Sequence, residues 1–412
     1  DNEDVKRVLK LRTMMAKTSV KKYEAMLKSR CKDGRVRGLL QFYGANKTGR
    51  WCLTGDHEIL TDKGEWVRLD DWNGGKIACW NINTEAISFQ KSEPNAFDYT
   101  GDVLSVDAQR CAQISTLDHK MPCWNRSKGI WEPREIKDVM LKRFTIPYVG
   151  QRHIKASYNS NQLRVLVMVQ ADGHYTQDGD LRLRFKKDRK IERCKHLLRK
   201  NEIVYQQNKN SDDSTVITVK NRCMPIWLKM FNTKTFGCWL FDESPDVFFD
   251  ELEYWDSYRS GPNSIQYSTI NKRNADIIQA FAAITGRSAT LVVKDKDEKW
   301  QKAYILNIWL NPLGRSEIRK EQQSIIRFVG KVYCPTTPTG YFLVRRQGKI
   351  WITGNCGRLV QVQNLPQNHL DDLNDARELV KSKDLESIEF LYDSVSDTLS
   401  QLIRTAFIPS PG

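Results

Sequence analysis

The sequence predicts a multidomain chain whose central part is a mainly β domain interrupted by an α+β domain. At 412 residues the chain is long enough for two to four domains with their own cores. Short segments punctuated by Gly, Asp and Trp, such as 66–69 and 76–80, are typical of strands. A longer apolar run at 163–173 and an alternating basic segment at 181–187 indicate a different kind of domain.

The first part of the chain has another pattern. Residues 1–30 place apolar side chains at three- and four-residue spacings among Lys and Arg, which predicts helices. From Gly34 the sequence changes to short segments separated by glycines, which indicates strands and a loop. The chain begins at Asp1 rather than Met, so we expect a fragment of a longer protein.

The charge favours a polyanionic partner. The chain carries 65 Lys and Arg against 50 Asp and Glu, a net charge of +15. Such an excess is typical of proteins that bind nucleic acid, although a solvated basic surface is the alternative. No apolar run approaches the roughly 18 residues that a membrane helix needs, so we expect no membrane partner.

The cysteines exclude a zinc finger of the common kind. None of the ten forms a Cys-x-x-Cys pair, and no Cys and His set has zinc-finger spacing. We expect reduced thiols, some buried and a few reactive. The expected location is therefore cytoplasmic, in a bacterial cell or a phage-infected host, and the expected state is a monomer.

The two ends of the chain resemble one family when they are joined. Thr48-Gly49-Arg50 before Trp51, and Gln363-Asn364-Leu365-Pro366 after Cys356, are similar to motifs of the family A DNA polymerases. The resemblance implies that Arg50 and Gln363 contact a primer-template. Because the chain stops at Gly412, before the family's first metal-binding Asp, we expect no polymerase activity from it.

The segment between these ends resembles an intein, a protein element that excises itself. Residues 52–60 are similar to the opening block of inteins, and Thr116-Leu117-Asp118-His119 matches their Thr-x-x-His block. Residues 332–342 and 350–355 are similar to the closing blocks. The resemblance implies a horseshoe-like splicing domain of the Hint type, and it makes 1–51 and 356–412 the flanking exteins.

The resemblance also assigns roles at the first junction. Cys52 would attack the carbonyl of Trp51 and convert an amide into a thioester, which requires protonation of the departing nitrogen. His119 would serve Cys52 as acid or base, and Thr116 would support the scissile amide or its oxyanion. Cys356 would then attack the thioester as a thiolate.

The second junction departs from the common pattern. Asn355 would cyclise to a succinimide and release the insert, but the residue before it is Gly354 where the family usually has His. None of the six His lies between 197 and 355, so assistance must come from another group, from water, or from a His supplied by the fold. Cys334 stands where Asp is common; it either helps coordinate the steps or is a buried structural thiol.

The middle of the insert resembles a LAGLIDADG homing endonuclease. The apolar run 163–173 ends in Ala171-Asp172-Gly173, with Gly173 as an expected helix C-cap, although composition alone also allows a Val-rich strand. A looser second match at 248–257 contains Asp256. The resemblance implies two pseudo-symmetric αββ halves whose helices pack together, so that Asp172 and Asp256 hold Mg²⁺ at scissile phosphates.

Basic side chains are the expected contacts to double-stranded DNA at the homing site. The alternation in 181–187 places one basic face on a strand of a type that fits the major groove, with a solvated amphipathic strand as the alternative. We expect the DNA contacts to include Arg182, Arg184, Lys186, Lys294 and Lys296. Because Ser257 replaces the usual Gly of the second match, DNA binding is better supported than cleavage.

The expected domain boundaries follow from these resemblances. The splicing domain would comprise 52–150 and 326–355, and the endonuclease 151–325. Splicing would need no cofactor, whereas the endonuclease would need Mg²⁺. Two alternatives remain open: a DNA-binding nuclease within an inert splicing frame, and a hedgehog-like module that cleaves without ligation, which would need neither Asn355 nor Cys356.

Overall fold

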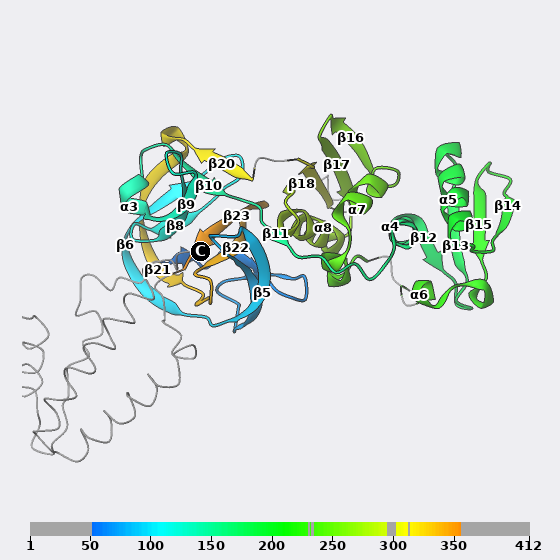
Figure 1. The fold of residues 1–412 in the computed structure, drawn as a ribbon, viewed down its shortest axis with the longest axis horizontal. Coiled ribbons are helices and arrows are strands. Elements are labelled where there is room, and N and C mark those ends of the chain that lie inside the picture. Colours follow the sequence, from blue (N-terminus) through cyan, green and yellow to red (C-terminus); the bar gives the residue numbers. More distant parts are fainter. Residues whose placement is uncertain (1–51, 230, 232–234, 295–301, 312–313, 356–412) are drawn as a thin grey trace, which may run out of the picture.

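The computed structural model describes residues 52–229, 231, 235–294, 302–311 and 314–355 (Figure 1). The expectations for five residues fall outside this part of the chain: Arg50, Trp51, Lys296, Cys356 and Gln363. No helix within the described ranges is long and apolar enough to cross a lipid bilayer.

The described chain forms a β-rich unit and an inserted α+β unit. The β-rich unit has one short α-helix, one 3-10 helix (η3, Lys320–Gln322) and fifteen strands, which come from both sides of the insertion. Its elements are β1 (Leu53–Thr54), β2 (Glu58–Leu60), β3 (Trp66–Arg68), β4 (Gly75–Trp80), β5 (Ala86–Ser92), β6 (Ala96–Val106), β7 (Ile114–Thr116), β8 (Lys120–Asn125), β9 (Ile130–Glu135), α3 (Ile136–Val139), β10 (Phe144–Pro147), β11 (Gln151–Arg152), β20 (Arg315–Ile318), β21 (Gln323–Tyr333), β22 (Tyr341–Arg346) and β23 (Lys349–Gly354).

Two sheets dominate the β-rich unit. Strands β1, β21, β6 and β7 close on themselves as a small barrel, and seven strands form a sheet in the order β11-β5-β4-β22-β2-β3, with β23 added to β22. Strands β10 and β20 form one separate pair, and β8 and β9 form another. The predicted strands at 66–69 and 76–80 correspond to β3 and β4. The long antiparallel ladder between β6 and β21 joins sequence from both sides of the insertion.

The inserted unit consists of two halves with the same topology. Each half has a helix, a hairpin, a second helix and a second hairpin, and each sheet has the strand order 1-2-4-3. The first half contains α4 (Ser160–Asp172), β12 (Gly173–Tyr175), β13 (Leu181–Phe185), α5 (Asp188–Lys200), β14 (Gln206–Lys209) and β15 (Thr215–Val219), followed by α6 (Ile226–Lys229). The second contains α7 (Pro245–Leu252), β16 (Ser257–Gly261), β17 (Ser264–Thr269), α8 (Lys272–Ile284), β18 (Ser288–Lys294) and β19 (Ala303–Trp309).

The apolar run at 163–173 forms a helix rather than a strand. Asn159 caps helix α4 and Gln162 bonds back to it, a reciprocal capping box that defines where the helix begins. Gly173 is the C-cap residue, but its backbone is extended rather than left-handed. A Cβ at Gly173 would lie 2.6 Å from the carbonyl oxygen of Val169. Close backbone approach, and not a positive φ, therefore explains this glycine.

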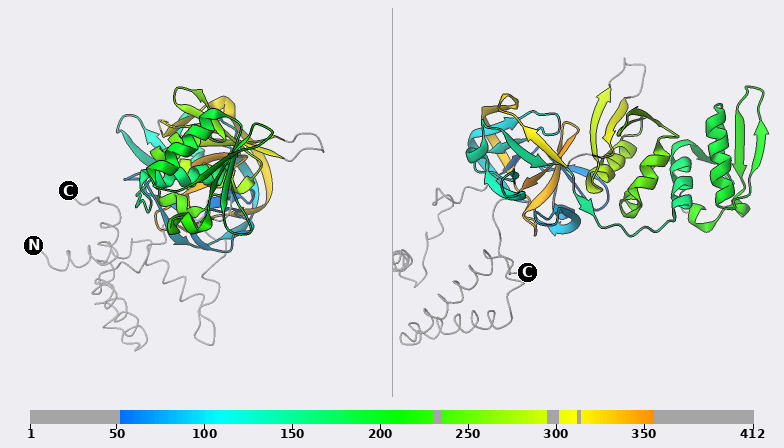
Figure 2. Two further views of the ribbon diagram at one scale, coloured as in Figure 1. Left: turned by 90° about the vertical axis from the view of Figure 1, so that its right-hand side faces the viewer. Right: turned by 45° about the horizontal axis from the view of Figure 1, so that its top comes forward.

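The second half lies between the β-rich unit and the first half (Figures 1 and 2). Helices α4 and α7 pack against each other between the two halves. Arg164 of α4 donates to the fully buried carboxylate of Glu251 on α7 at 3.0 Å, and Arg193 of α5 pairs with the same group. The expected pairing of two αββ halves through their helices agrees with this arrangement.

The strands also show how the chain passes between the two units. Strand β10 pairs with β20 in register Phe144 to Ile318, so the β-rich unit already includes residues 315–318. Residues 325 and 326, where we expected the boundary, are consecutive within strand β21. On the other side, β11 at 151–152 pairs in parallel with β5.

Strand β23 is buried on both of its faces. Trp351 belongs to the core of the β-rich unit, whereas Ile350 and Ile352 belong to a second cluster that continues into the helices of the inserted unit. Full burial of such a side chain contributes roughly 1.5–3 kcal/mol. The position of β23 therefore depends on both units.

Arg345 connects the two units electrostatically. Its side chain is 3% exposed, and its guanidinium donates to the Glu58 carboxylate at 2.7 and 2.9 Å. The same group pairs with Asp276 of helix α8 and lies 4.5 Å from the centre of the Trp66 ring. A buried guanidinium needs such partners, because an unpaired charge in a protein interior is costly.

We predict that Arg345→Met destabilises the protein by about 3–5 kcal/mol, because it leaves two carboxylates without their buried partner. Thermal unfolding measures the change. Arg327→Met is the matched control, since Arg327 pairs with Asp102 at 3.4 Å and its side chain is 64% exposed; it should cost under about 1 kcal/mol. Equal effects of the two substitutions would contradict the assigned role of Arg345.

Candidate functional site

Cys52 is held in the wall of the small barrel, next to Thr116. Leu53 pairs with Tyr333 on one side and with Ser115 on the other. The backbone N–H of Cys52 donates to the Thr116 hydroxyl at 3.1 Å. The Thr116 N–H donates back to the Cys52 carbonyl at 3.0 Å. Cys52 is fully buried. The nitrogen of the Trp51–Cys52 peptide bond is therefore hydrogen-bonded to the Thr116 hydroxyl in a buried position.

Cys334 lies beside Cys52. Because Leu53 is opposite Tyr333 and Thr54 is opposite Val332, the next residues outward are Cys52 and Cys334. Both belong to one small buried cluster with Val332. Opposite residues of an antiparallel pair share a face of the sheet, so the two sulfur atoms are on the same side.

His119 connects the first junction to strand β23. Its backbone N–H donates to the Thr116 carbonyl at 3.1 Å. Its Nε2 lies 2.6 Å from the hydroxyl oxygen of Thr353, and the ring is almost completely buried. Thr353 comes two residues before Asn355 in the chain. The fold therefore brings an imidazole to the C-terminal strand, although the surrounding sequence contains none.

Gln113 contacts the same face of this strand as His119 does. Its Oε1 accepts a hydrogen bond from the Trp351 indole at 2.8 Å and lies 3.3 Å from the Thr353 hydroxyl. Its Nε2 donates to the Ser115 hydroxyl at 2.9 Å. Gln113 is fully buried, so these bonds satisfy a polar group that could not otherwise be placed in the core.

Asn355 is buried against the turn formed by residues 337–340. Its backbone N–H donates to the Gly340 carbonyl at 2.8 Å, which continues the β22–β23 ladder by one step. We assign the oxygen and nitrogen of the carboxamide from their hydrogen-bond partners, because the two atoms are distinguished only by this network. In the assignment that satisfies both atoms, Oδ1 accepts from the Thr337 N–H at 2.8 Å and from the Thr337 hydroxyl at 3.3 Å, and Nδ2 donates to the Gly340 carbonyl at 3.3 Å.

Gly354 has no room for a side chain. A Cβ placed there would lie 2.2 Å from the carbonyl oxygen of Lys120 and 3.1 Å from its carbonyl carbon. Real Cβ atoms do not approach backbone atoms this closely, and backbone cannot rotate away as a side chain can. The absence of the expected His thus has a steric reason: β23 packs directly on β8 at this residue.

The other buried cysteines have the character of structural thiols. Burial raises the pKa of the thiols of Cys111, Cys123 and Cys194 to about 12, and that of Cys79 to about 11. Because the thiolate is the nucleophile, groups with such pKa values are inert near neutral pH.

His57 is a structural histidine. Its Nδ1 lies 2.9 Å from the Thr54 carbonyl, and the Ile114 N–H donates to its Nε2 at 3.3 Å. Burial lowers the pKa of His57, while a hydrogen bond with Asp56 opposes the shift. A ring with one donor and one acceptor contact remains neutral, which fits a core position.

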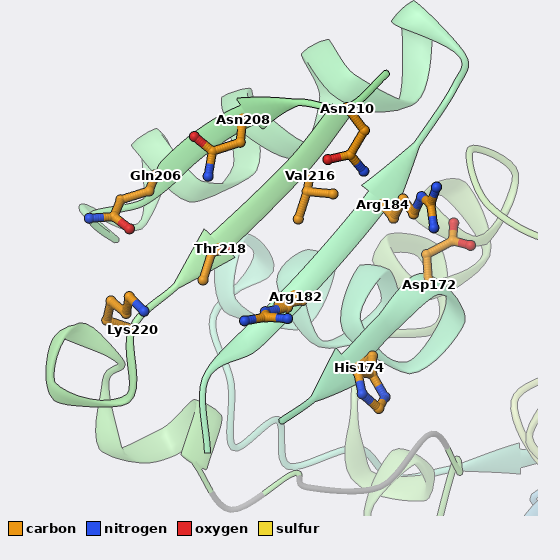
Figure 3. A pocket seen from close by; sticks show the side chains of 10 residues that line it. All are labelled: Asp172, His174, Arg182, Arg184, Gln206, Asn208, Asn210, Val216, Thr218 and Lys220. Atoms are coloured by element: carbon orange, nitrogen blue, oxygen red, sulfur yellow. The ribbon is translucent and has the colours of Figure 1, made fainter. Parts of the chain in front are cut away.

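A separate polar surface lies on the first half of the inserted unit. The exposed face of the sheet β12-β13-β15-β14 lines a hollow of about 600 Å³ (Figure 3). Arg182 and Arg184 project from alternate positions of β13, whose burial follows the predicted period of two. The hollow is lined by Asp172, His174, Arg182, Arg184, Gln206, Asn208, Asn210, Val216, Thr218 and Lys220.

Several of these basic groups already have partners. Arg184 pairs with Asp212 at 2.6 Å, and Lys186, one residue beyond β13, approaches the same carboxylate at 3.6 Å. Lys220 pairs with Asp180 at 2.9 Å. Lys294 is the exposed last residue of β18 and belongs to the sheet of the second half.

Asp172 is the last residue of α4 and faces an ammonium group. The Nζ of Lys190 lies 2.6 Å from Oδ2 of Asp172, and it also lies 5.6 Å from the centre of the Trp255 ring. An acidic side chain at a helix C-terminus is unfavourable without a cation. In this structure the compensating cation is Lys190.

Asp256 occupies the related place in the second half, but not on a helix. Helix α7 ends at Leu252, and Asp256 lies in the turn directly before β16. Asp172 thus ends a helix, whereas Asp256 follows one after a turn. Each does stand directly before the first strand of its half.

The described residues contain no group of three or more His, Cys, Asp or Glu side chains that could hold a metal ion by themselves. Mg²⁺ is often bound by one or two carboxylates together with substrate phosphates. The carboxylates of Asp172 and Asp256 are donors of the right type, so they fit such a site only with DNA phosphates as further ligands.

Three residues of the first site were not anticipated from the sequence: Gln113, Thr353 and Thr337. Thr353 stands within the closing block 350–355, two residues before Asn355, and this position could have indicated it as a site residue. Thr337 likewise stands within a closing block, at 332–342, whereas Gln113 carries no sequence signal, because a buried amide is recognised by its three-dimensional partners.

Comparison with known proteins confirms the resemblance to a DNA polymerase for a fragment of the chain. No family model matches. A DNA polymerase of Bacillus phage SP02 is 71% identical over 149 residues, which cover 32% of this chain and 22% of that protein. The β subunit of ribonucleoside-diphosphate reductase from Aquifex aeolicus (strain VF5) is 26% identical over 383 residues, covering 79% of this chain and 53% of that protein. The chain thus spans at most about half the length of these relatives.

Solved structures with some similarity include a homing endonuclease and an intein. I-DmoI in complex with DNA and Mn is 12% identical with a TM-score of 0.26, covering 37% of this chain and 92% of that one. The AceL NrdHF class 3 split intein, in a splice-inactive variant, is 7% identical with a TM-score of 0.28, covering 74% and 99%.

We predict that Gly354→Ala destabilises the protein by about 1–3 kcal/mol, because the added methyl group forces β23 away from β8. Thermal unfolding measures this. Gly261→Ala is the control, since a Cβ there would meet only the hydroxyl of Ser264, and its effect should stay within about 0.5 kcal/mol. An unchanged stability of Gly354→Ala would contradict the steric explanation.

Proposed function

We propose that residues 52–355 are an intein that excises itself and joins Trp51 to Cys356 within a DNA polymerase. The main observation behind this proposal is that residues from the two ends of segment 52–355 lie close together in the β-rich unit. Cys52, Thr116 and His119 are linked through backbone and side-chain bonds, and His119 reaches Thr353 at 2.6 Å. Asn355 follows on the same strand.

The names of the two sequence relatives support an inserted element. A phage DNA polymerase and a reductase subunit have different activities, yet both resemble parts of one chain. A match that covers 79% of this chain must reach into residues 52–355, since the two end segments are much shorter. An element that can stand within unrelated host proteins accounts for both similarities.

The first step acts at the Trp51–Cys52 bond. The Cys52 sulfur attacks the Trp51 carbonyl carbon, the C–N bond breaks, and the departing nitrogen of Cys52 takes a proton. In the folded chain this nitrogen already donates to the Thr116 hydroxyl. We assign Thr116 to orientation of the scissile peptide, and the imidazole of His119, whose backbone bonds to Thr116, to proton transfer. Cys334 is placed beside the nucleophile and assigned to the coordination of the steps.

The later steps transfer and release the chain. The Cys356 sulfur attacks the Trp51 thioester, and Cys52 leaves as a thiol. The Asn355 Nδ2 then attacks its own backbone carbonyl, the bond to Cys356 breaks, and a succinimide remains on the insert. The freed amine of Cys356 finally attacks the thioester, which gives an ordinary peptide bond. These steps need no cofactor.

For residues 151–325 we propose a site-specific endonuclease that cuts double-stranded DNA with Mg²⁺. The paired halves, the basic face around Arg182 and Arg184, and the aspartates before β12 and β16 support this function. We assign Lys294 and Lys296 to contacts with DNA, and Arg50 and Gln363 to the primer-template of the joined polymerase. The strand pairing suggests a domain boundary nearer 315 than 325. We further propose a monomer in the cytoplasm of a bacterial or phage-infected cell.

The splicing scheme predicts different effects of substitutions at the two ends of the insert, Cys52 and Asn355. Cys52→Ala should abolish the joined product, because no thioester forms. Asn355→Ala should block cleavage before Cys356, because no amide nitrogen is available for cyclisation. Intact mass spectrometry of the expressed chain distinguishes these products from the parent. A joined product in either variant would refute the scheme, and cleavage without any joining in the parent would favour an autoprocessing module.

The endonuclease proposal predicts Mg²⁺-dependent cutting of polymerase DNA that lacks the insert. Asp172→Asn should abolish cutting, because a neutral amide binds Mg²⁺ more weakly than the negatively charged carboxylate. A gel-based cleavage assay measures this, with Asp213→Asn as a control on an exposed ion pair with Lys209. Cutting that persists in Asp172→Asn would contradict the metal assignment, and DNA binding without cutting in the parent would indicate a binding domain alone.

A further inference from the structure

The turn at residues 337–340 surrounds the functional group of Asn355. The Thr337 N–H and hydroxyl both donate to Oδ1 of the carboxamide, at 2.8 and 3.3 Å, and the Gly340 carbonyl accepts from Nδ2 at 3.3 Å. The turn itself is closed by the Gly340 N–H, which donates to the Thr337 carbonyl at 3.2 Å. Thr337 and Asn355 are each only 6% exposed.

The conformation of the turn depends on glycine. Gly340 has a φ of +77°, in the left-handed region that other residues rarely adopt. This conformation allows the Gly340 carbonyl to accept from both the backbone N–H and the side chain of Asn355. All three polar contacts of the carboxamide thus come from one short segment with a defined shape.

These contacts match the needs of asparagine cyclisation. A neutral amide nitrogen is a weak nucleophile, because its lone pair is delocalised into the carbonyl group. When Nδ2 loses a proton, negative charge collects on Oδ1 and the nitrogen becomes able to attack. Donors aimed at Oδ1 stabilise that charge, and an acceptor on Nδ2–H favours the loss of the proton.

We propose that Thr337 is a positioning residue for cyclisation of Asn355, and that its two donors supply part of the assistance that an adjacent histidine would otherwise give. This proposal rests on the proposed splicing function. In the step itself, Nδ2 bonds to the backbone carbonyl carbon of Asn355, the bond to the Cys356 nitrogen breaks, and the proton lost by Nδ2 is balanced by the one that the leaving amine gains. Thr337 changes no covalent bond.

The position of Gly354 explains why such a device is needed. The close contact with the Lys120 carbonyl excludes every side chain at that residue, so no imidazole can stand directly before Asn355. His119 contacts the hydroxyl of Thr353 at 2.6 Å, whereas the contacts of the Asn355 carboxamide come from Thr337 and Gly340. Within the described residues, Thr337 and Gly340 are the partners of that carboxamide.

The test compares three variants of the full chain. Thr337→Val removes the hydroxyl donor at nearly constant volume, Thr337→Ser keeps it, and Thr339→Val removes a neighbouring hydroxyl that bonds to the Tyr341 carbonyl instead. Two rates are measured by intact mass: cleavage of the Trp51–Cys52 thioester by added thiol, and cleavage between Asn355 and Cys356. Succinimide at the new end, one water lighter than free Asn, identifies cyclisation.

We expect Thr337→Val to slow cleavage after Asn355 by about tenfold, the effect of one lost hydrogen bond to a developing charge. Thr337→Ser and Thr339→Val should stay near the parent rate. Cleavage by added thiol should be equal in all four chains, which a general loss of structure would not allow, and thermal unfolding checks this independently.

Other outcomes overturn the proposal. An unchanged rate after Asn355 in Thr337→Val, or equal losses in Thr337→Val and Thr337→Ser, would show that the hydroxyl does not assist cyclisation. A parallel loss of both cleavages would show a purely structural role. If the parent chain gives neither cleavage, the splicing function itself fails; if it gives both while Thr337→Val behaves like the parent, only the role of Thr337 fails.

Discussion

The burial of strand β23 on both faces is the constraint on which the candidate splicing site depends. Trp351 packs into the core of the β-rich unit, while Ile350 and Ile352 pack into a core shared with the inserted unit. Gln113 accepts a hydrogen bond from Trp351 of this strand, and the His119 ring bonds to its Thr353. A strand fixed from two sides holds its end within a narrow range of positions, as a reacting asparagine requires. The inserted unit is therefore part of the support for this site.

The geometry of the site reflects how closely β23 approaches β8. Direct backbone contact at Gly354 excludes the imidazole that is common at this position. The same proximity brings His119, which precedes β8, to the hydroxyl of Thr353. The packing of β23 on β8 therefore has two consequences: no histidine fits at position 354, and His119 lies within hydrogen-bond distance of Thr353. Polar groups of the turn at 337–340 surround the remaining functional group, the carboxamide of Asn355.

The two halves of the inserted unit share a topology but differ in their surfaces. The first half presents a polar hollow with Arg182 and Arg184 (Figure 3) and lies far from the β-rich unit. The second half uses its helix α8 for docking, through the pairing of Asp276 with Arg345 and the buried amide of Gln279, which donates to the Gly348 carbonyl at 2.7 Å. We infer that amino-acid substitutions are more constrained on the surface of the second half, which carries the docking contacts, than on the surface of the first half.

The sequence by itself predicted several element types and the candidate reacting residues. Punctuation by Gly, Asp and Trp predicted strands β3 and β4, and alternation predicted β13, because these patterns are local. The resemblance to homing endonucleases favoured helix α4, and the resemblance to inteins indicated Cys52, Thr116, His119 and Asn355. Only the tertiary structure decided which groups meet. The contact of His119 with Thr353, the lack of space at Gly354, the turn of Thr337 around Asn355 and the pairing of Asp172 with Lys190 each join residues whose proximity depends on strand register and packing. No local pattern records such contacts, because burial and distance arise only when the sheets and helices are assembled.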